Sequence, residues 1–144
     1  MLGIDTNLLV YAFREDLPEH LVSLRFIESR LSTKAPTCVA WPSVYEFFRI
    51  VTHKSVFKNP SSRKEAIAFL EALQSADRLV FLSHGPGHFQ SMIELCDESK
   101  AVGNLAFDVQ IAAIFKDYGV TEVATNDADF LRFRSFKILN PMDE

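Results

Sequence analysis

Cysteine is scarce in this sequence, and that scarcity excludes two classes of protein. The 144 residues contain only Cys38 and Cys96, which lie far apart and in no Cys-x-x-Cys arrangement. Neither a disulfide-stabilised fold nor a thiolate zinc site is therefore expected. Sparse, unpaired cysteines are typical of a reducing compartment, so we expect a cytoplasmic protein.

Long apolar runs, low-complexity tracts and a cationic leader are missing as well. No stretch approaches the roughly 18 apolar residues of a membrane span, and the first apolar run ends at Asp5 and Asn7. Hydrophobic residues make up 48% of the chain, which is enough for one domain to bury a core. We therefore expect a single domain over residues 1–144 that is neither exported nor inserted into a membrane.

A surplus of positive charge is also lacking. The chain has 15 Lys and Arg against 19 Asp and Glu, a net charge of −4, which gives no overall field to attract a nucleic acid. Any RNA affinity must then be local. The segment from His53 to Lys64 is interpreted as a basic loop that includes Lys54 and Lys58, and Arg49 lies shortly before it. These basic residues are explained equally well by contact with RNA phosphates and by simple exposure to solvent.

What the sequence does contain is a regular alternation of two patterns. Short apolar segments at residues 2–4, 38–41, 79–82, 120–124 and 136–139 predict strands. Between them, helical spacing of apolar residues predicts helices over 19–31, 42–52, 65–73, 89–96 and 104–118. Strands that alternate with helices predict an α/β fold in three layers, with a mostly parallel sheet of about five short strands covered on both faces.

Two acidic residues follow predicted strands. Asp5 comes directly after the first strand, and Asp127 follows the strand at 120–124. In open α/β sheets ligands bind beyond the carboxyl ends of the strands, so these two carboxylates are expected in one cleft. Each is equally well explained as the cap of the next helix, and position alone does not decide.

Asp108 lies on an otherwise apolar helix face. At about 100° per residue it shares that face with Ile111 and Phe115, while Gln110 and Asp117 lie opposite. An unpaired buried carboxylate costs several kcal/mol, so it needs a cation, hydrogen-bond donors or a raised pKa. A functional role is favoured over a structural ion pair.

Glu46 has two interpretations. Ser43-x-x-Glu46 matches a capping box, in which Glu46 bonds to the backbone at the helix start. If Pro42 is the first helical residue, however, Trp41 is the N-cap and Glu46 lies one turn further into the helix, where its side chain is free to bind a ligand. Both remain open from the residues alone.

The chemistry of these side chains indicates a hard metal ion. Carboxylates without nearby Cys or paired His favour Mg²⁺ or Mn²⁺. One or two dications would relieve the repulsion between clustered acids and activate a water for attack on phosphorus. A metal-assisted phosphodiester hydrolase is the interpretation we favour, whereas His84 and His88, which flank Gly85-Pro86-Gly87, are expected to be surface turn residues rather than ligands.

Four segments, in order and over nearly the whole chain, resemble the motifs of the PIN-domain family, and within it the VapC-type toxins of bacterial toxin–antitoxin pairs. They are Asp5-Thr6-Asn7, Trp41 to Arg49 with Thr52-His53, Gly103-Asn104 to Asp108 with Ile111-Ala112-Ala113, and Thr125 to Phe130 with Arg132-Phe133. Phe107 stands where many members have a polar residue.

This resemblance implies an Mg²⁺- or Mn²⁺-dependent endoribonuclease that arrests growth, is inhibited by a cognate antitoxin and forms homodimers. It implies that Asp5, Glu46, Asp108 and Asp127 are the catalytic, metal-binding acids. Around them, Thr6, Asn7, Thr125 and Asp129 would support the site or orient the substrate, and Arg49, Lys54 and Lys58 would contact RNA or the antitoxin.

Two rival functions remain. A receiver-like phosphotransfer domain also places Asp after the first parallel strand, but Val123-Ala124-Thr125-Asn126 lacks the Lys that it requires after a late strand. The non-enzymatic rival is a catalytically inactive PIN scaffold that only binds other proteins. The presence of every acid argues against it.

Overall fold

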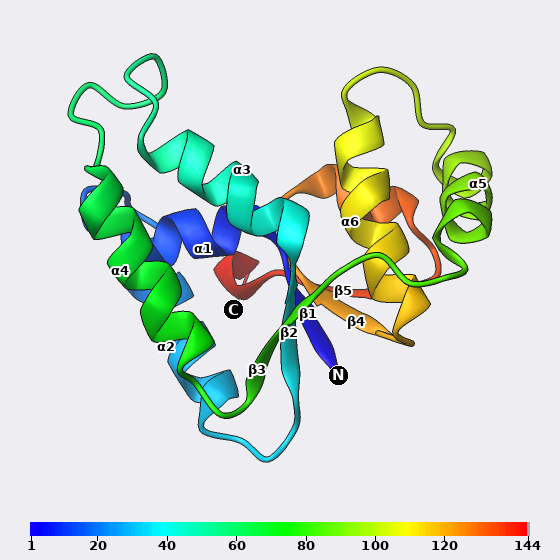
Figure 1. Cartoon of the computed structure of the whole chain (residues 1–144), viewed down its shortest axis with the longest axis horizontal. Helices are drawn as coiled ribbons and strands as arrows, with labels where there is room; N and C mark the ends of the chain where they lie inside the picture. Colours follow the sequence, from blue (N-terminus) through cyan, green and yellow to red (C-terminus); the bar gives the residue numbers. More distant parts are fainter. Residues whose placement is uncertain (144) are drawn as a thin grey trace.

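The strands form one parallel sheet in this computed structural model, which describes residues 1–143. Its five strands are β1 (Leu2–Ile4), β2 (Thr37–Ala40), β3 (Leu79–Leu82), β4 (Glu122–Ala124) and β5 (Lys137–Leu139). They lie in the order β3-β2-β1-β4-β5 (Figure 1), and each neighbouring pair is parallel. The prediction of an α/β fold with about five short strands is confirmed, and the sheet in these residues is wholly parallel.

The central place of β1 brings distant parts of the chain together. Gly3 pairs with Cys38 of β2 on one side and with Val123 of β4 on the other. The register continues past the strand ends, because the Asp5 backbone N–H donates to the Ala124 carbonyl oxygen at 3.0 Å. The residues that follow β1 and β4 therefore lie side by side at the carboxyl edge of the sheet.

Helices cover both faces of the sheet. One face packs against α1 (Thr6–Phe13), α2 (His20–Leu31), α3 (Trp41–Val51) and α4 (Arg63–Gln74), and the other against α5 (His88–Ser99), α6 (Leu105–Asp117) and the 3₁₀ helix η1 (Ala128–Arg132). A short 3₁₀ helix, η2 (Pro141–Asp143), follows β5. In Figure 1, α2 and α4 stand to the left of the sheet and α5 and α6 to the right.

The alternation of side chains along the strands explains the two cores. Leu2, Ile4 and Val39 belong to the core under α1 to α4, whereas Cys38 and Ala40 belong to the core under α5 and α6. The fold therefore has three layers, as expected.

Several element boundaries differ from the prediction, by up to three residues at the end of α5. Trp41, expected to end a strand over 38–41, is instead the first residue of α3, and Ala40 is its N-cap. The predicted basic loop was too long at its end, because Arg63 and Lys64 already belong to α4. A capping box begins α4: the Ser62 and Glu65 side chains each accept from the other residue's backbone N–H at 3.1 Å.

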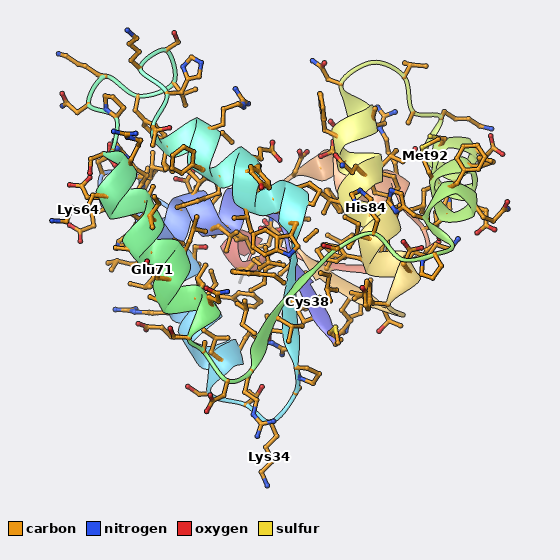
Figure 2. All side chains as sticks on the ribbon, in the orientation of Figure 1. Lys34, Cys38, Lys64, Glu71, His84 and Met92 are labelled. Atoms are coloured by element: carbon orange, nitrogen blue, oxygen red, sulfur yellow. The ribbon has the colours of Figure 1, made fainter. Side chains whose placement is uncertain are left out.

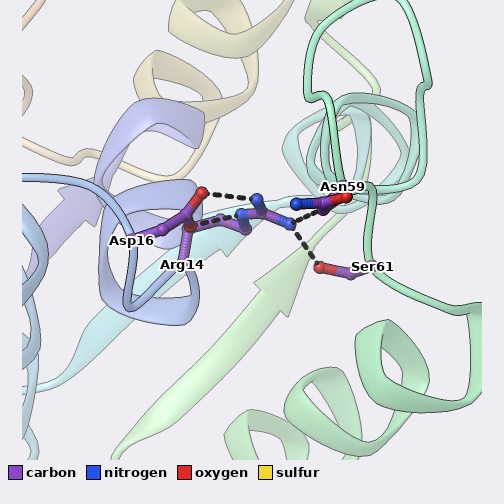
Figure 3. A network of polar contacts seen from close by, with 4 residues as sticks. All are labelled: Arg14, Asp16, Asn59 and Ser61. Atoms are coloured by element: carbon purple, nitrogen blue, oxygen red, sulfur yellow. Dashed lines mark hydrogen bonds and ion pairs between the residues drawn. The ribbon is translucent and has the colours of Figure 1, made fainter.

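Arg14 fixes the segment between α3 and α4 to the end of α1 (Figure 3). Its guanidinium donates to the Asp16 carboxylate at 2.8 and 2.6 Å, to the Asn59 carbonyl oxygen at 2.8 Å and to Ser61 Oγ at 3.0 Å. The same group lies 4.0 Å from the centre of the Phe57 ring. Residues 52–62, which we call the α3–α4 loop, are thereby held against the end of α1, the helix that Asp5 caps.

The helices and the two cysteines bear on the expectations about a membrane span and a disulfide. No helix within residues 1–143 is long and apolar enough to cross a membrane. Cys38 and Cys96 are both free thiols, as their spacing predicts.

Candidate active site

Asp5 lies at the start of α1, directly beyond the central strand. Its carboxylate accepts hydrogen bonds from the Thr6 backbone N–H at 2.7 Å, from Asn7 Nδ2 at 2.9 Å and from Thr125 Oγ1 at 2.7 Å. The side chain caps the helix, which is one of the two interpretations that the sequence left open. The capping oxygen is Oδ1, while Oδ2 is directed to Asn7 and Thr125.

The Thr125 hydroxyl joins the two strand ends. It donates to Asp5 and accepts from Asn7 Nδ2 at 3.0 Å and from the Asp127 backbone N–H at 2.9 Å. Asn7 Oδ1 in turn accepts from the Asn126 backbone N–H at 3.1 Å. These bonds fix residues 5–7 and 125–127 against each other, although they are more than a hundred positions apart in the chain.

Glu46 enters the site from α3. Its carboxylate accepts a hydrogen bond from Thr6 Oγ1 at 3.0 Å. Ser43, the other half of the possible capping box, is fully buried and its hydroxyl has no partner in the structure. The capping-box interpretation is therefore wrong, and Glu46 is free to join the acids beside it.

Asp108 occupies the first turn of α6, half-buried on the face that Ile111 and Phe115 also occupy. Burial, together with the neighbouring charges of Asp5, Asp127, Glu46 and Asp129, raises the pKa of its carboxyl to about 7. Within residues 1–143, no hydrogen bond to this carboxylate offsets these effects. Asp108 is thus the acid of the site that most needs a cation.

Asp127 is the N-cap of η1, and its Oδ1 accepts from the Asp129 backbone N–H at 2.8 Å. One carboxylate oxygen from each of Asp108, Asp127 and Asp129 lies within 4.8 Å of the other two. Asp129 is exposed and also lies 3.6 Å from Arg132 Nε. Asp127 therefore caps a helix, as one of the two interpretations predicted, and it also lies close to other acids.

The four predicted acids meet in one small pocket of about 110 Å³. Its lining consists of Asp5, Thr6, Asn7, Glu46, Ile50, Asp108 and Asp127, and we call it the acid pocket. Four separate segments contribute its carboxylates, namely the ends of β1 and β4 and the helices α3 and α6. All of them lie at the carboxyl edge of the sheet, where ligands bind in open α/β folds.

The electrostatics of Asp5 reflect a balance. Burial raises the pKa of its carboxyl, the hydrogen bonds from Thr125 and Thr6 lower it, and the charges of Glu46 and Asp127 raise it; the net result is a pKa of about 6. Asp5 and Asp108 therefore both hold protons more tightly than an ordinary Asp does when no cation is present.

A second polar cluster, which no sequence pattern predicted, lies on the opposite side of α6. Asp117, expected to lie opposite the buried face, has a side chain only 4% exposed, because α5 covers it. It accepts hydrogen bonds from Ser91 Oγ at 2.7 Å, His88 Nδ1 at 3.1 Å and the Gly85 backbone N–H at 3.2 Å. Burial raises the pKa of Asp117, but these hydrogen bonds outweigh it, so the pKa lies below its ordinary value.

This cluster corrects the expectation for His88. His84 is exposed, as a surface turn residue should be, but His88 is partly buried and paired with Asp117. The two residues are 29 positions apart, and no local pattern connects them. The cluster fastens the segment between β3 and α5 to the end of α6.

The basic residues lie around the acid pocket rather than in it. Arg49 lines a neighbouring pocket that shares Glu46 with the acid pocket. Lys54 and Lys58 are exposed on the α3–α4 loop. None of the three contributes to the lining of the acid pocket.

Comparison with known proteins agrees with this arrangement of sheet and acids. The chain belongs to the PIN domain family, whose sequence profile matches residues 3–135. It is 34% identical to Ribonuclease VapC31 of Mycobacterium tuberculosis, over 98% of this chain and 99% of that protein. It is 29% identical to Ribonuclease VapC33 of the same species, over the full length of both.

Solved structures share the fold. VapC20 of M. tuberculosis, described as a sarcin-ricin loop cleaving toxin, has a TM-score of 0.68 at 12% identity, covering 91% of this chain and 93% of that one. FitAcB from Neisseria gonorrhoeae has a TM-score of 0.67 at 20% identity, covering 99% of each chain. At such identities these structures show the architecture alone.

Proposed function

We propose that this protein is a metal-dependent endoribonuclease and the toxin of a toxin–antitoxin pair. The observation that carries the proposal is the acid pocket, in which Asp5, Glu46, Asp108 and Asp127 converge from four parts of the chain. Membership of the PIN domain family and the ribonuclease names of the full-length relatives support the same activity. The family assignment argues against the receiver-like alternative.

The acid pocket suits Mg²⁺ or Mn²⁺. Its donors are carboxylate, hydroxyl and amide oxygens with no sulfur or imidazole, a set that hard dications prefer. We infer that Asp5, Glu46, Asp108 and Asp127 are the metal-binding and catalytic acids and that Asp129 supports them from the rim. When bound, the dication supplies positive charge that lowers the pKa of a water and stabilises the charge that develops on the phosphodiester oxygens.

The chain's own residues prepare this site. Thr125 and Asn7 hold the Asp5 carboxylate in one orientation, and Thr6 does the same for Glu46. Asp108 has no such partner in residues 1–143, so its side chain is the one most free to adjust to a ligand. The pocket of about 110 Å³ has room for only a few water-sized groups of about 30 Å³ each, which suits ions and phosphate oxygens rather than a base.

The partners that we infer are RNA, a cognate antitoxin and a second copy of the chain. Structural relatives include VapBC2 from Rickettsia felis bound to a DNA fragment from their promoter, and a toxin–antitoxin complex from Klebsiella pneumoniae. Arg49, Lys54 and Lys58 supply the positive charge for RNA phosphates. We further propose that residues 1–144 act as a single nuclease domain in the cytoplasm.

The decisive experiment compares two variants of the acid pocket with one control variant outside it. Asp5→Asn and Asp108→Asn should each abolish metal-dependent cleavage of RNA while leaving the fold and antitoxin binding intact. Asp97→Asn, which changes an exposed acid on α5 outside the pocket, is the matched control and should cleave normally. Cleavage is measured on end-labelled RNA with Mg²⁺, with Mn²⁺ and with EDTA, and the cut ends are mapped.

Two outcomes would reject the proposal. Full activity of either pocket variant, or of the wild-type chain in excess EDTA, would show that the acids and their metal do not carry the reaction. A wild-type chain that binds an antitoxin but cuts no RNA with either metal would favour the inactive PIN scaffold.

A further inference from the structure

A second pocket opens directly beside the acid pocket, between α3 and α6. It has a volume of about 290 Å³ and is lined by Pro42, Tyr45, Glu46, Arg49, Phe107, Gln110 and Ile111. Glu46 belongs to the linings of both pockets. A ligand seated in the acid pocket can therefore extend into this second one without leaving the surface.

A third pocket of about 320 Å³ continues in the same direction. It is lined by Trp41, Pro42, Tyr45, His84 and Gln110, and it shares Pro42, Tyr45 and Gln110 with the second pocket. We call these two pockets together the α3–α6 groove. It leads from the acid pocket past the start of α3 to the segment that follows the edge strand β3, which runs toward α5 in Figure 1.

Aromatic side chains with exposed rings line this groove. Tyr45 is 74% exposed, Phe107 64% and Trp41 37%. The Trp41 and Tyr45 rings lie 6.5 Å apart, centre to centre, along one side of α3. Phe107 occupies α6, the other side of the groove, directly before Asp108.

Polar groups are interspersed among these rings. Arg49 and Gln110 lie in the second pocket. His84 lies in the third, where its Nε2 is 3.4 Å from Gln110 Nε2. The groove therefore offers flat apolar faces together with a cation and hydrogen-bonding groups, unlike the acid pocket next to it.

We propose that the α3–α6 groove binds unpaired bases of a single-stranded RNA on one side of the bond that is cut. This inference rests on the proposed function, and it names the form in which the substrate binds. Unpaired bases stack on aromatic side chains and expose their edges to amide and imidazole groups, whereas bases within a duplex offer no free face. Arg49 is placed to contact a phosphate between the stacked bases and the acid pocket.

Continuity with the acid pocket favours this occupant over a protein surface. The groove adjoins the acid pocket at Glu46, so a chain whose phosphate lies among the acids reaches Tyr45 and Phe107 as its neighbouring nucleotides extend along the groove. The acid pocket has less than half the volume of either groove pocket. Phosphate and base are thereby assigned to different, adjoining spaces.

Steady-state cleavage of a short single-stranded RNA tests the inference. Tyr45→Ala and Phe107→Ala should each raise KM by about 10- to 100-fold, the usual loss for one stacked base, with kcat changed much less. Tyr45→Phe, which keeps the ring, should restore the KM of the wild-type chain. Phe89→Ala, which removes a 71% exposed ring on α5 outside the groove, is the matched control and should leave KM unchanged.

Stacking is measured separately from cleavage by fluorescence. An oligoribonucleotide that carries 2-aminopurine at each position in turn is titrated with full-length Asp108→Asn protein and with the same protein carrying Tyr45→Ala or Phe107→Ala. Quenching at one or two adjacent positions, lost with either ring, supports the inference. If the wild-type chain cuts no RNA, the proposed function fails while this titration still decides whether the groove stacks bases.

Two results would overturn the inference. One is an unchanged KM and unchanged quenching in both alanine variants. The other is a loss of dimer mass on gel filtration with light scattering in Tyr45→Ala or Phe107→Ala while quenching persists, which would assign these rings to contact with a second copy of the chain.

Discussion

At the scale of single residues, the acids of the pocket differ in how they are supported. Asp5 receives three hydrogen bonds and Glu46 one, whereas burial and like charges act on Asp108 without a donor in residues 1–143. In the chain without a cation, the pKa of Asp5 is about 6 and that of Asp108 about 7, both above the ordinary 3.8. Protons and a dication therefore compete for the same carboxylates.

This competition predicts how stability and metal binding depend on pH. Because both pKa values are raised, the folded chain binds more protons than the unfolded chain between about pH 4 and pH 7, so this pair lowers the free energy of unfolding as pH rises through that window. Added Mg²⁺ should raise Tm clearly at about pH 8, where the carboxylates are charged, and much less at about pH 5, where they are protonated.

Thermal unfolding followed by circular dichroism, with and without Mg²⁺ at each pH, measures this effect. The double variant Asp5→Asn with Asp108→Asn is the control, since it should show neither the pH-dependent loss of stability nor the shift with Mg²⁺. An equal Mg²⁺ shift in the wild-type chain at both pH values would contradict the prediction.

Three of the four acids in the pocket could be recognised from the sequence. Asp5 and Asp127 were recognisable because each follows a strand, and Asp108 because it interrupts an apolar helix face. The role of Glu46 was undecidable from its neighbours, since its partner Thr6 lies 40 positions away. Asp117 was misplaced for the same reason: α5, which covers it, is distant in the sequence.

At the scale of elements, the Arg14 side chain connects α1 to the α3–α4 loop. Its guanidinium is almost fully buried and forms four hydrogen bonds, while Asp16, its ion-pair partner, is 59% exposed. Most of its contribution must then come from the loop contacts with Asn59, Ser61 and Phe57 rather than from the exposed ion pair.

Replacement of this residue separates the two contributions. Arg14→Met should lower the free energy of unfolding by about 2–3 kcal/mol, because the part-buried hydrogen bonds from a charged donor to Asn59 and Ser61 are lost. Asp16→Asn, the control, should cost less than about 1 kcal/mol, as exposed ion pairs usually do. Urea unfolding gives both values, and hydrogen exchange in residues 52–62 should accelerate only in Arg14→Met; equal losses in the two variants would contradict this account.

Element boundaries were predicted less well than element types. The helix over 19–31 and the strands at 2–4 and 79–82 were identified within one residue, since their apolar spacing and caps are local signals. Trp41 was assigned to a strand because its ring continues an apolar run, but Pro42 beside it already has the backbone of the first helical turn. Arg63 and Lys64 were assigned to a loop by their charge, although Ser62 caps a helix directly before them.

At the scale of the whole molecule, charge is unevenly distributed around a net value of −4. The α3–α4 loop carries Lys54 and Lys58 at the end of the molecule where α3 finishes, whereas Lys34 lies at the opposite end (Figure 2). An RNA that extends from the acid pocket along α3 toward its end would meet the two loop lysines and not Lys34.

This distribution predicts a local dependence of RNA binding on salt. If Lys54 and Lys58 each contact a phosphate, Lys54→Ala and Lys58→Ala should each reduce the slope of log affinity against log salt by about 0.7, the value per phosphate for a single strand. Lys34→Ala, the control, should leave the slope unchanged. Fluorescence anisotropy with a labelled RNA and the Asp108→Asn variant measures the slope, and identical slopes in all three lysine variants would remove the loop from the RNA-binding surface.

The place of β1 in the middle of the sheet has a consequence for the chain as it emerges from the ribosome. Asp5 is synthesised before the other acids of the pocket, but the strand before it needs β4 as its neighbour, and the last acid of the pocket follows β4 at position 127. A nascent chain, or one interrupted before that point, holds at most three of the four acids and lacks Thr125. The cell that makes this protein is thus exposed to a complete pocket only once translation has passed residue 127.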